Sequence, residues 1–191
     1  MPEDRAVQQV RGLALALFIT TFFGALWGMV GALALPGAVS LLAGVLVGTV
    51  TVVLLLGSAR LLRLSQRLPV AAGEIGTNPF GTGSYRLAVL FEVIAIPISA
   101  AVLNNAGYPG AVISAIAVIV GLHFFGLIPA FESRRFAAVG GAMVAVGLLS
   151  LALPTGTGAS PRSALVGLGC ALVLWLSAFP PLVSTLRRAG A

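Results

Sequence analysis

Two ionisable side chains, Glu92 and His123, stand inside long apolar stretches in which charged residues are rare. Glu92 lies six residues after Arg86 in the run YRLAVLFEVIAIPIS, and His123 is the only histidine of the chain, in the run VIVGLHFFG. A carboxyl and an imidazole can exchange a proton near neutral pH, or they can hydrogen-bond two helices together. The pair is therefore the candidate site for binding a proton or a solute.

The depth of the two residues predicts a contact between them. With a helical rise of 1.5 Å per residue, Glu92 lies roughly 9 Å and His123 roughly 12 Å from the same membrane edge. Their two runs are joined by a short turn, so we expect antiparallel neighbours. An ionised carboxylate at this depth costs several kcal/mol unless it is paired, hydrated or neutralised. Three states stay open: a protonated Glu92, a pair with charged His123, or a wet cavity that both residues line.

Two further residues of the third run belong to the candidate site. Pro97 removes the hydrogen bond to the carbonyl of Val93 and is expected to bend the helix, while Ser99 falls on the same face as Glu92. A bent helix beside an intramembrane acid is typical of transport sites, and it is also frequent in ordinary membrane helices. Six more polar or aromatic residues could extend the lining, although spacing selects none of them: Thr20, Thr21, Trp27, Thr49, Thr51 and Trp175.

The sequence lacks the patterns that several kinds of catalytic and metal site require. One histidine and one glutamate are too few for a closed zinc site, and neither a GxSxG run nor a second histidine for haem is present. The single cysteine, Cys170, can form no disulfide within the chain. We therefore predict no metal, no cofactor and no catalytic residue. A lipid-processing enzyme with Glu92 and His123 as acid and base stays open as a third interpretation.

The composition predicts that helices in a membrane position these residues. Of the 191 residues, 59% are hydrophobic and only 8% are charged, whereas soluble domains have about a quarter of their residues charged. No run alternates as a membrane β-strand does. We expect one all-α transmembrane domain, residues 1–191, with a connector at 58–84. Six spans are predicted, near residues 12–35, 37–57, 85–103, 109–130, 136–153 and 163–186.

The distribution of arginine predicts the orientation. Ten of the eleven basic residues fall before the first span, after the sixth, or in the second and fourth connections, and only Arg162 falls on the other side. The positive-inside rule then places both termini in the cytoplasm of a bacterial cell, with the chain in its cytoplasmic membrane. Arg60, Arg63 and Arg67 form one helical stripe, which predicts contact with lipid headgroups and not with nucleic acid. The first run is too long for a signal peptide, so we expect it to be retained.

Two sequence patterns bear on packing. Residues 36–48, PGAVSLLAGVLVG, match residues 109–121, PGAVISAIAVIVG, at seven of thirteen positions, so the bundle could consist of three repeated helical hairpins. Small residues recur every four positions as Gly24 and Gly28, and again as Ser40, Gly44 and Gly48. Such faces let helices approach closely. We favour packing within the chain, and a second copy or a partner membrane protein is the alternative.

The run GLHFF resembles the fourth helix of a group of small, uncharacterised bacterial six-helix integral membrane proteins. These proteins have an acidic residue in the third helix and a GLHF-x-P-L-A-like run in the fourth. The match is clearest at Glu92 and Gly121–Phe124. Gly126 stands where that pattern has proline, and Pro129 follows three residues later, so the local bend is not implied here. The resemblance implies the architecture and a role for Glu92 and His123, and it implies no activity.

These observations favour a small-solute transporter or permease in which Glu92 and His123 form the titrating centre. The alternative from another class is a structural or accessory membrane subunit whose small-residue faces bind a partner helix. Membrane lipids are expected partners of either protein. The two interpretations differ in one physical respect: a transport site needs a cavity that reaches both ionisable side chains, and a structural contact needs dry packing.

Overall fold

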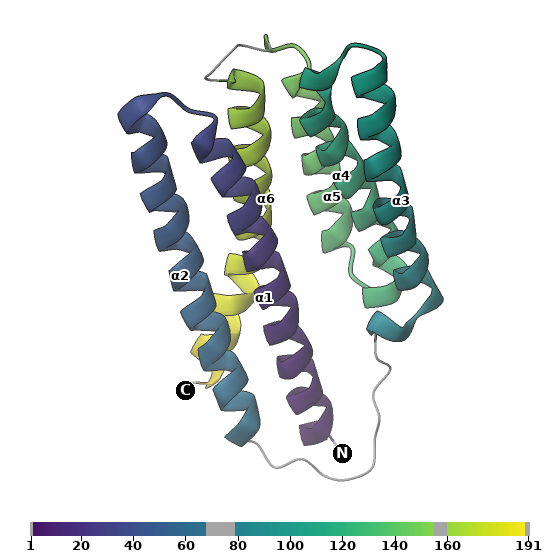
Figure 1. The fold of residues 1–191 in the computed structure, drawn as a ribbon. Helices are drawn as coiled ribbons and strands as arrows, with labels where there is room; N and C mark the ends of the chain where they lie inside the picture. Colours follow the sequence, from purple (N-terminus) through teal and green to yellow (C-terminus); the bar gives the residue numbers. More distant parts are fainter. Residues whose placement is uncertain (1, 68–78, 155–159, 190–191) are drawn as a thin grey trace.

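The computed structural model describes residues 2–67, 79–154 and 160–189, and these residues form six α-helices and two short 3-10 turns (Figure 1). The helices are α1 (Pro2–Leu33), α2 (Gly37–Arg67), α3 (Gly83–Asn105), α4 (Val112–Phe131), α5 (Arg135–Ser150) and α6 (Pro161–Ala189). The 3-10 turns are η1 (Pro79–Gly81) and η2 (Pro109–Ala111). The predicted all-helical architecture is confirmed for the described residues.

Five of the six helices are long and apolar enough to cross a membrane, so the chain is a multi-pass membrane protein. The exception is α5, which has 16 residues and a length of about 24 Å, short of the roughly 30 Å of hydrocarbon. It ends at Ser150, three residues before the end of the predicted run. Pro154 disfavours helical geometry at Leu153. The guanidinium of Arg162 binds the carbonyls at this end, which makes an earlier stop favourable.

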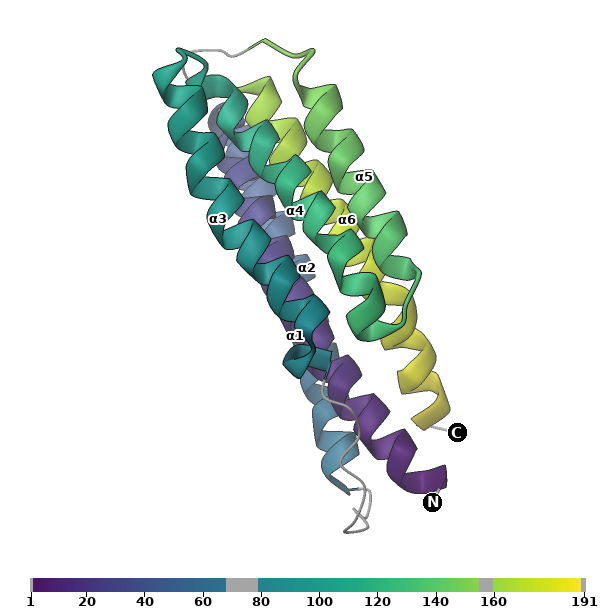
Figure 2. The same cartoon turned by 90° about the vertical axis from the view of Figure 1, so that its right-hand side faces the viewer.

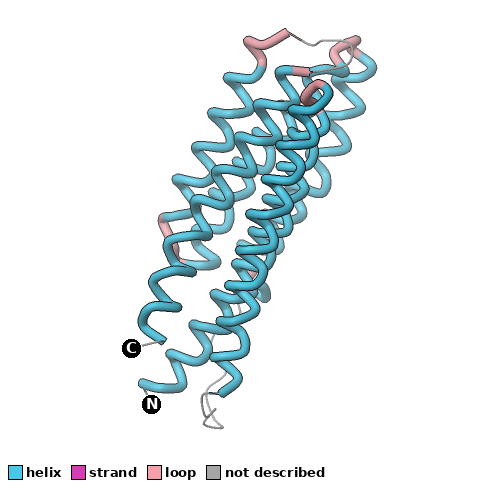
Figure 3. The backbone as a smooth tube through the Cα atoms, turned by 90° about the vertical axis from the view of Figure 1, so that its left-hand side faces the viewer, coloured by secondary structure: helices cyan, strands magenta, loops and turns pink. Residues whose placement is uncertain are grey.

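The helices pack side by side in the order α2, α1, α6, α5, α4, α3 (Figure 1). The most extensive pairings, α1 with α6 and α4 with α5, join different predicted hairpins. Among the described residues α1 does not pack directly against α3. The row of helices is therefore open between these two helices, although all six run roughly along one direction (Figures 2 and 3).

Glycine allows the closest approaches between helices. Gly31 of α1 and Gly167 of α6 are in such contact that a Cβ added to either would overlap the other's backbone. Gly121 of α4 and Gly140 of α5 meet in the same way. In a membrane this close packing replaces the hydrophobic drive that operates in water.

The two glycines of the expected small-residue face of α2 have no packing partner in the described part of the chain. A Cβ added to Gly44 or Gly48 would find nothing within 4 Å among the described residues. Instead, α2 inserts Val47 toward Gly28 of α1. The prediction that this face packs inside the chain is therefore wrong, because α2 lies at the end of the row and has α1 as its main neighbour.

The two ends of the bundle differ in charge. The start of α1, the ends of α2 and α6 and the start of α3 lie at one end, which we call the arginine-rich end (Figure 1). Arg162 lies at the opposite end, where it donates hydrogen bonds to the carbonyls of Gly110, Ser150, Leu151 and Leu153. This arginine therefore joins the end of α5 to the turn before α4, a role that the charge count does not reveal.

Candidate intramembrane binding site

The structure brings Glu92 of α3 and His123 of α4 into contact. His123 Nδ1 lies 3.1 Å from Glu92 Oε2 and 3.0 Å from the backbone carbonyl oxygen of Ala88. Because a carbonyl oxygen only accepts hydrogen bonds, Nδ1 carries a proton. This proton is shared between two acceptors of α3. A second proton on the ring would bind at Nε2, which has no hydrogen-bond partner among the described residues.

A small residue holds the two helices close enough for this contact. Gly126 lies one turn after His123, and a Cβ placed there would meet the Ala88 Cβ at 2.8 Å. Ala88 is also the one buried residue of α3. A larger side chain at position 126 would push α3 away and lengthen both bonds of Nδ1. Gly126 therefore positions the Glu92–His123 pair.

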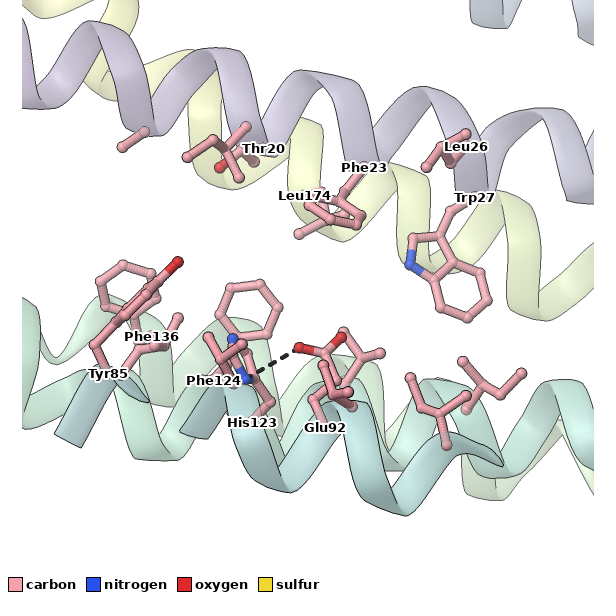
Figure 4. A pocket seen from close by; sticks show the side chains of 18 of the residues that line it. Thr20, Phe23, Leu26, Trp27, Tyr85, Glu92, His123, Phe124, Phe136 and Leu174 are labelled. Atoms are coloured by element: carbon pink, nitrogen blue, oxygen red, sulfur yellow. Dashed lines mark ion pairs between the residues drawn. The ribbon is translucent and has the colours of Figure 1, made fainter. Parts of the chain in front are cut away.

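The pair lies on the wall of a cavity of about 700 Å³ between α1 on one side and α3 and α4 on the other. This volume is within the usual range of small-molecule sites. The Glu92 side chain is 24% exposed and that of His123 is 11% exposed, so the carboxylate is the more accessible group. Figure 4 shows the pair facing α1 across the gap.

The opposite wall comes from one face of α1. It carries Thr20, Phe23 and Trp27, which point toward the cavity across from Glu92 (Figure 4). Thr20 and Trp27 are among the six residues that spacing alone does not select, and Phe23 is not predicted from the sequence. The i, i+3, i+7 spacing places the three side chains on one face of α1. The sequence does not reveal that this face lines a cavity, because that depends on which helices pack against α1.

Aromatic rings gather at the end of the cavity nearest the arginine-rich end. Phe80, Tyr85 and Phe131 lie with ring centroids 5.3–6.4 Å apart, and Phe136 stacks on Phe124 at 5.9 Å. All five rings line the cavity. Three of the five have a signal in the sequence, since Tyr85, Phe131 and Phe136 lie at or next to the start or end of neighbouring apolar runs.

The other residues named from sequence lie apart from the pair. α3 continues as one helix through Pro97, which lines the cavity, whereas Ser99 is not part of the lining and donates its hydroxyl to Ile96 O at 2.9 Å. Thr49 and Thr51 bond carbonyls of their own helix. Thr21 is fully buried.

Arg60 and Arg63 are exposed at the arginine-rich part of α2, which continues through the predicted helical segment of the connector. The side chain of Arg67 and residues 68–78 lie outside the described part. Cys170 is buried in the core with Trp27 and Met143. No group of three or more histidine, cysteine, aspartate or glutamate residues lies together among the described residues.

Comparisons with protein-family models, with curated proteins and with solved structures find no match to this chain. The interpretation of the site therefore depends on its geometry.

Proposed function

We propose that the protein is a proton-linked transporter that binds a small molecule in the cavity between α1, α3 and α4. One observation carries the proposal: Glu92 and His123 both line a cavity of about 700 Å³, and both side chains are partly exposed. An intramembrane ionisable pair beside such a space is, by default, the first hypothesis for a functional site. We also propose that α5, which lies along α4, crosses as a sixth span and that the arginine-rich end faces the cytoplasm.

The chemistry of the pair supports the exchange of one proton. The pair is neutral when it holds one proton in addition to the one on Nδ1, either as carboxylate and imidazolium or as carboxylic acid and neutral imidazole. It carries one negative charge when that proton leaves. Histidine is suited to this exchange because it titrates near neutral pH. A ligand that favours one of these states would couple its own binding to the proton.

The alternative function, a structural or accessory subunit, is favoured by one specific observation. His123 Nδ1 bonds two acceptors of α3, so it also fastens α3 to α4. A hydrogen bond of this kind between membrane helices is worth about 0.6–2 kcal/mol. In that case replacing the pair would lower stability and would leave proton movement unchanged.

Proton movement across a vesicle membrane separates the two functions. Proteoliposomes enclosing a pH-sensitive dye receive tetraphenylphosphonium, tetraphenylborate or triphenylphosphine oxide, three phenyl compounds of similar size but different charge. We expect at least one compound to change the internal pH faster than it does in protein-free vesicles. Glu92→Gln and His123→Asn, which keeps a donor near the Nδ1 position, should abolish this increment.

Glu132→Gln is the matched control, because Glu132 is exposed on the turn after α4 and loses the same charge. It should behave as the unmodified protein does. Proton movement that is equal in Glu92→Gln and the unmodified protein would refute the proposal, and so would the absence of any protein-dependent signal with all three compounds. A loss of thermal stability in the variants with no such signal would favour the structural subunit.

A further inference from the structure

The cavity is lined by several aromatic rings and by few ionisable side chains. Among the described residues that line it, Glu92, His123 and Tyr85 are the only ionisable ones, and none is an arginine. Within the lining, α1, η1, α5 and α6 contribute apolar and aromatic side chains and one threonine. The site can therefore be neutral or negative, depending on whether the pair holds its additional proton, and the described lining residues include no fixed positive group to attract an anion.

We propose that the ligand is a lipophilic organic cation, with a quaternary or delocalised charge, held between the Glu92 carboxylate and the aromatic faces. This inference rests on the proposed function and specifies its substrate class. A quaternary or delocalised cation needs no hydrogen-bond acceptors beyond one counter-charge, which matches a wall with a single carboxylate. An amphipathic anion would find no partner of opposite charge apart from His123, which Glu92 already binds.

The ring faces supply the second part of the recognition. Phe23 and Trp27 extend from α1 toward the cavity, and Tyr85, Phe124 and Phe136 line the opposite wall, displaced along the helices from Trp27 (Figure 4). A cation within about 6 Å of an aromatic centroid is attracted by the ring quadrupole, and most strongly where water is excluded. The apolar substituents of the ligand would lie against the remaining aliphatic wall.

The path into the cavity leads from the lipid. Ile19, Phe23 and Leu26 of α1 and Val93 of α3 line the cavity and are also 39–63% exposed, on the two helices that do not pack together. Arg134 and Arg135, by contrast, are exposed next to the aromatic end and would repel a cation that arrived from there. A lipophilic cation concentrates in the membrane, so the opening between α1 and α3 gives it direct access.

Binding of the cation should release a proton. In the proton-loaded state the pair is neutral, and the bound cation favours the state in which Glu92 is ionised and His123 is neutral. One proton then leaves from His123 to water as one positive charge enters. Tyr85 is the only other titratable group among the described lining residues and is not needed for this balance. The inferred cycle is an exchange of one cation for one proton.

Direct binding tests this substrate class. Radiolabelled tetraphenylphosphonium is bound to the purified protein in detergent, with unlabelled tetraphenylborate or triphenylphosphine oxide as competitors. We expect saturable binding of the cation, weak competition by the other two, and binding that weakens as the pH falls. In weakly buffered solution, binding should release about one proton for each cation bound. Glu92→Gln should weaken the binding about tenfold or more and abolish the release, because it removes the counter-charge.

A neighbouring pair of phenylalanines gives a control that does not alter the charge. Phe23 lines the cavity, whereas Phe22 is 59% exposed and lies outside the lining. Phe23→Leu should weaken binding of the cation several-fold, and Phe22→Leu should leave it unchanged. Equal effects of the two substitutions would overturn the aromatic part of the inference even if Glu92→Gln failed to fold.

The outcomes separate this inference from the proposed function. Preferential binding of the anionic or neutral compound, or proton movement with it, would refute the inference that the ligand is a cation. It would leave the proposal of proton-linked transport standing. Absence of proton movement with all three compounds would refute the transport proposal. Cation binding without proton release would show that the pair is a fixed counter-charge and would overturn the exchange.

Discussion

Replacing Arg162 by alanine should be among the most damaging single changes at the surface of the bundle. Its guanidinium donates to four backbone carbonyls, with donor–acceptor distances of 2.6–3.1 Å. Three of these carbonyls lie at the end of α5 or just after it, at Ser150, Leu151 and Leu153, and the fourth, that of Gly110, lies just before α4. Alanine would leave all four without this donor.

The expected loss of stability follows from the number of bonds and their exposure. An intramolecular hydrogen bond contributes about 0.5–1.5 kcal/mol net, and bonds to charged groups contribute more. Because Arg162 is partly exposed, water can replace some of the donors, so we expect a total of about 2–4 kcal/mol. For a chain of this size, that loss corresponds to a fall in melting temperature of about 5–15 °C. Arg162→Lys should recover only part of it, since one ammonium cannot reproduce the planar fork.

The single cysteine supplies the assay. Cys170 is fully buried, so a fluorogenic maleimide should react with it only as the protein unfolds during a thermal ramp in detergent. Arg63→Ala is the matched control, because it removes an exposed arginine. If Arg162→Ala and Arg63→Ala melted within about 1 °C of each other, the reasoning about the four carbonyls would be refuted.

Two further predictions concern packing and orientation. Gly167→Ala should lower the melting temperature by several degrees, because a Cβ there overlaps the backbone of Gly31, whereas Gly44→Ala should leave it unchanged. Equal effects would contradict the assigned helix contacts, and a change in oligomeric mass with Gly44→Ala would identify α2 as an interface between copies. In spheroplasts, a cysteine at Gly107 should react with a membrane-impermeant maleimide, while one at Ser133 should react only after lysis. The reverse pattern would show that the arginine-rich end faces outward.

The Glu92–His123 contact could be predicted because few quantities determine it. The helical rise fixes the depth of each residue, and the short turn between α3 and α4 makes the two helices neighbours. Each side chain also has few ionisable alternatives at that depth. The hydrogen bond from Nδ1 to the Ala88 carbonyl could not be predicted in this way, since it depends on how each helix is rotated about its axis.

The cavity could not be predicted, because it results from packing between helices that are distant in sequence. The association of α1 with α6 and of α4 with α5 leaves α1 away from α3. Thr20 and Thr21 illustrate the difficulty: they are adjacent, yet Thr20 faces the cavity and Thr21 is fully buried. Small-residue spacing was similarly ambiguous, since Gly31 and Gly167 meet while Gly44 and Gly48 face open space.

The contact between Gly31 and Gly167 has a consequence for how the chain is made. α1 enters the membrane first, but its most extensive neighbour, α6, is synthesised last of the six helices. Until α6 is inserted, the glycine face of α1 and the fully buried Thr21 have only lipid or other helices to cover them. Loop closure over more than a hundred residues is slow compared with local hairpin formation. Assembly should therefore finish only after α6 leaves the ribosome, and nascent chains that stop before α6 should be the form that cellular quality control removes.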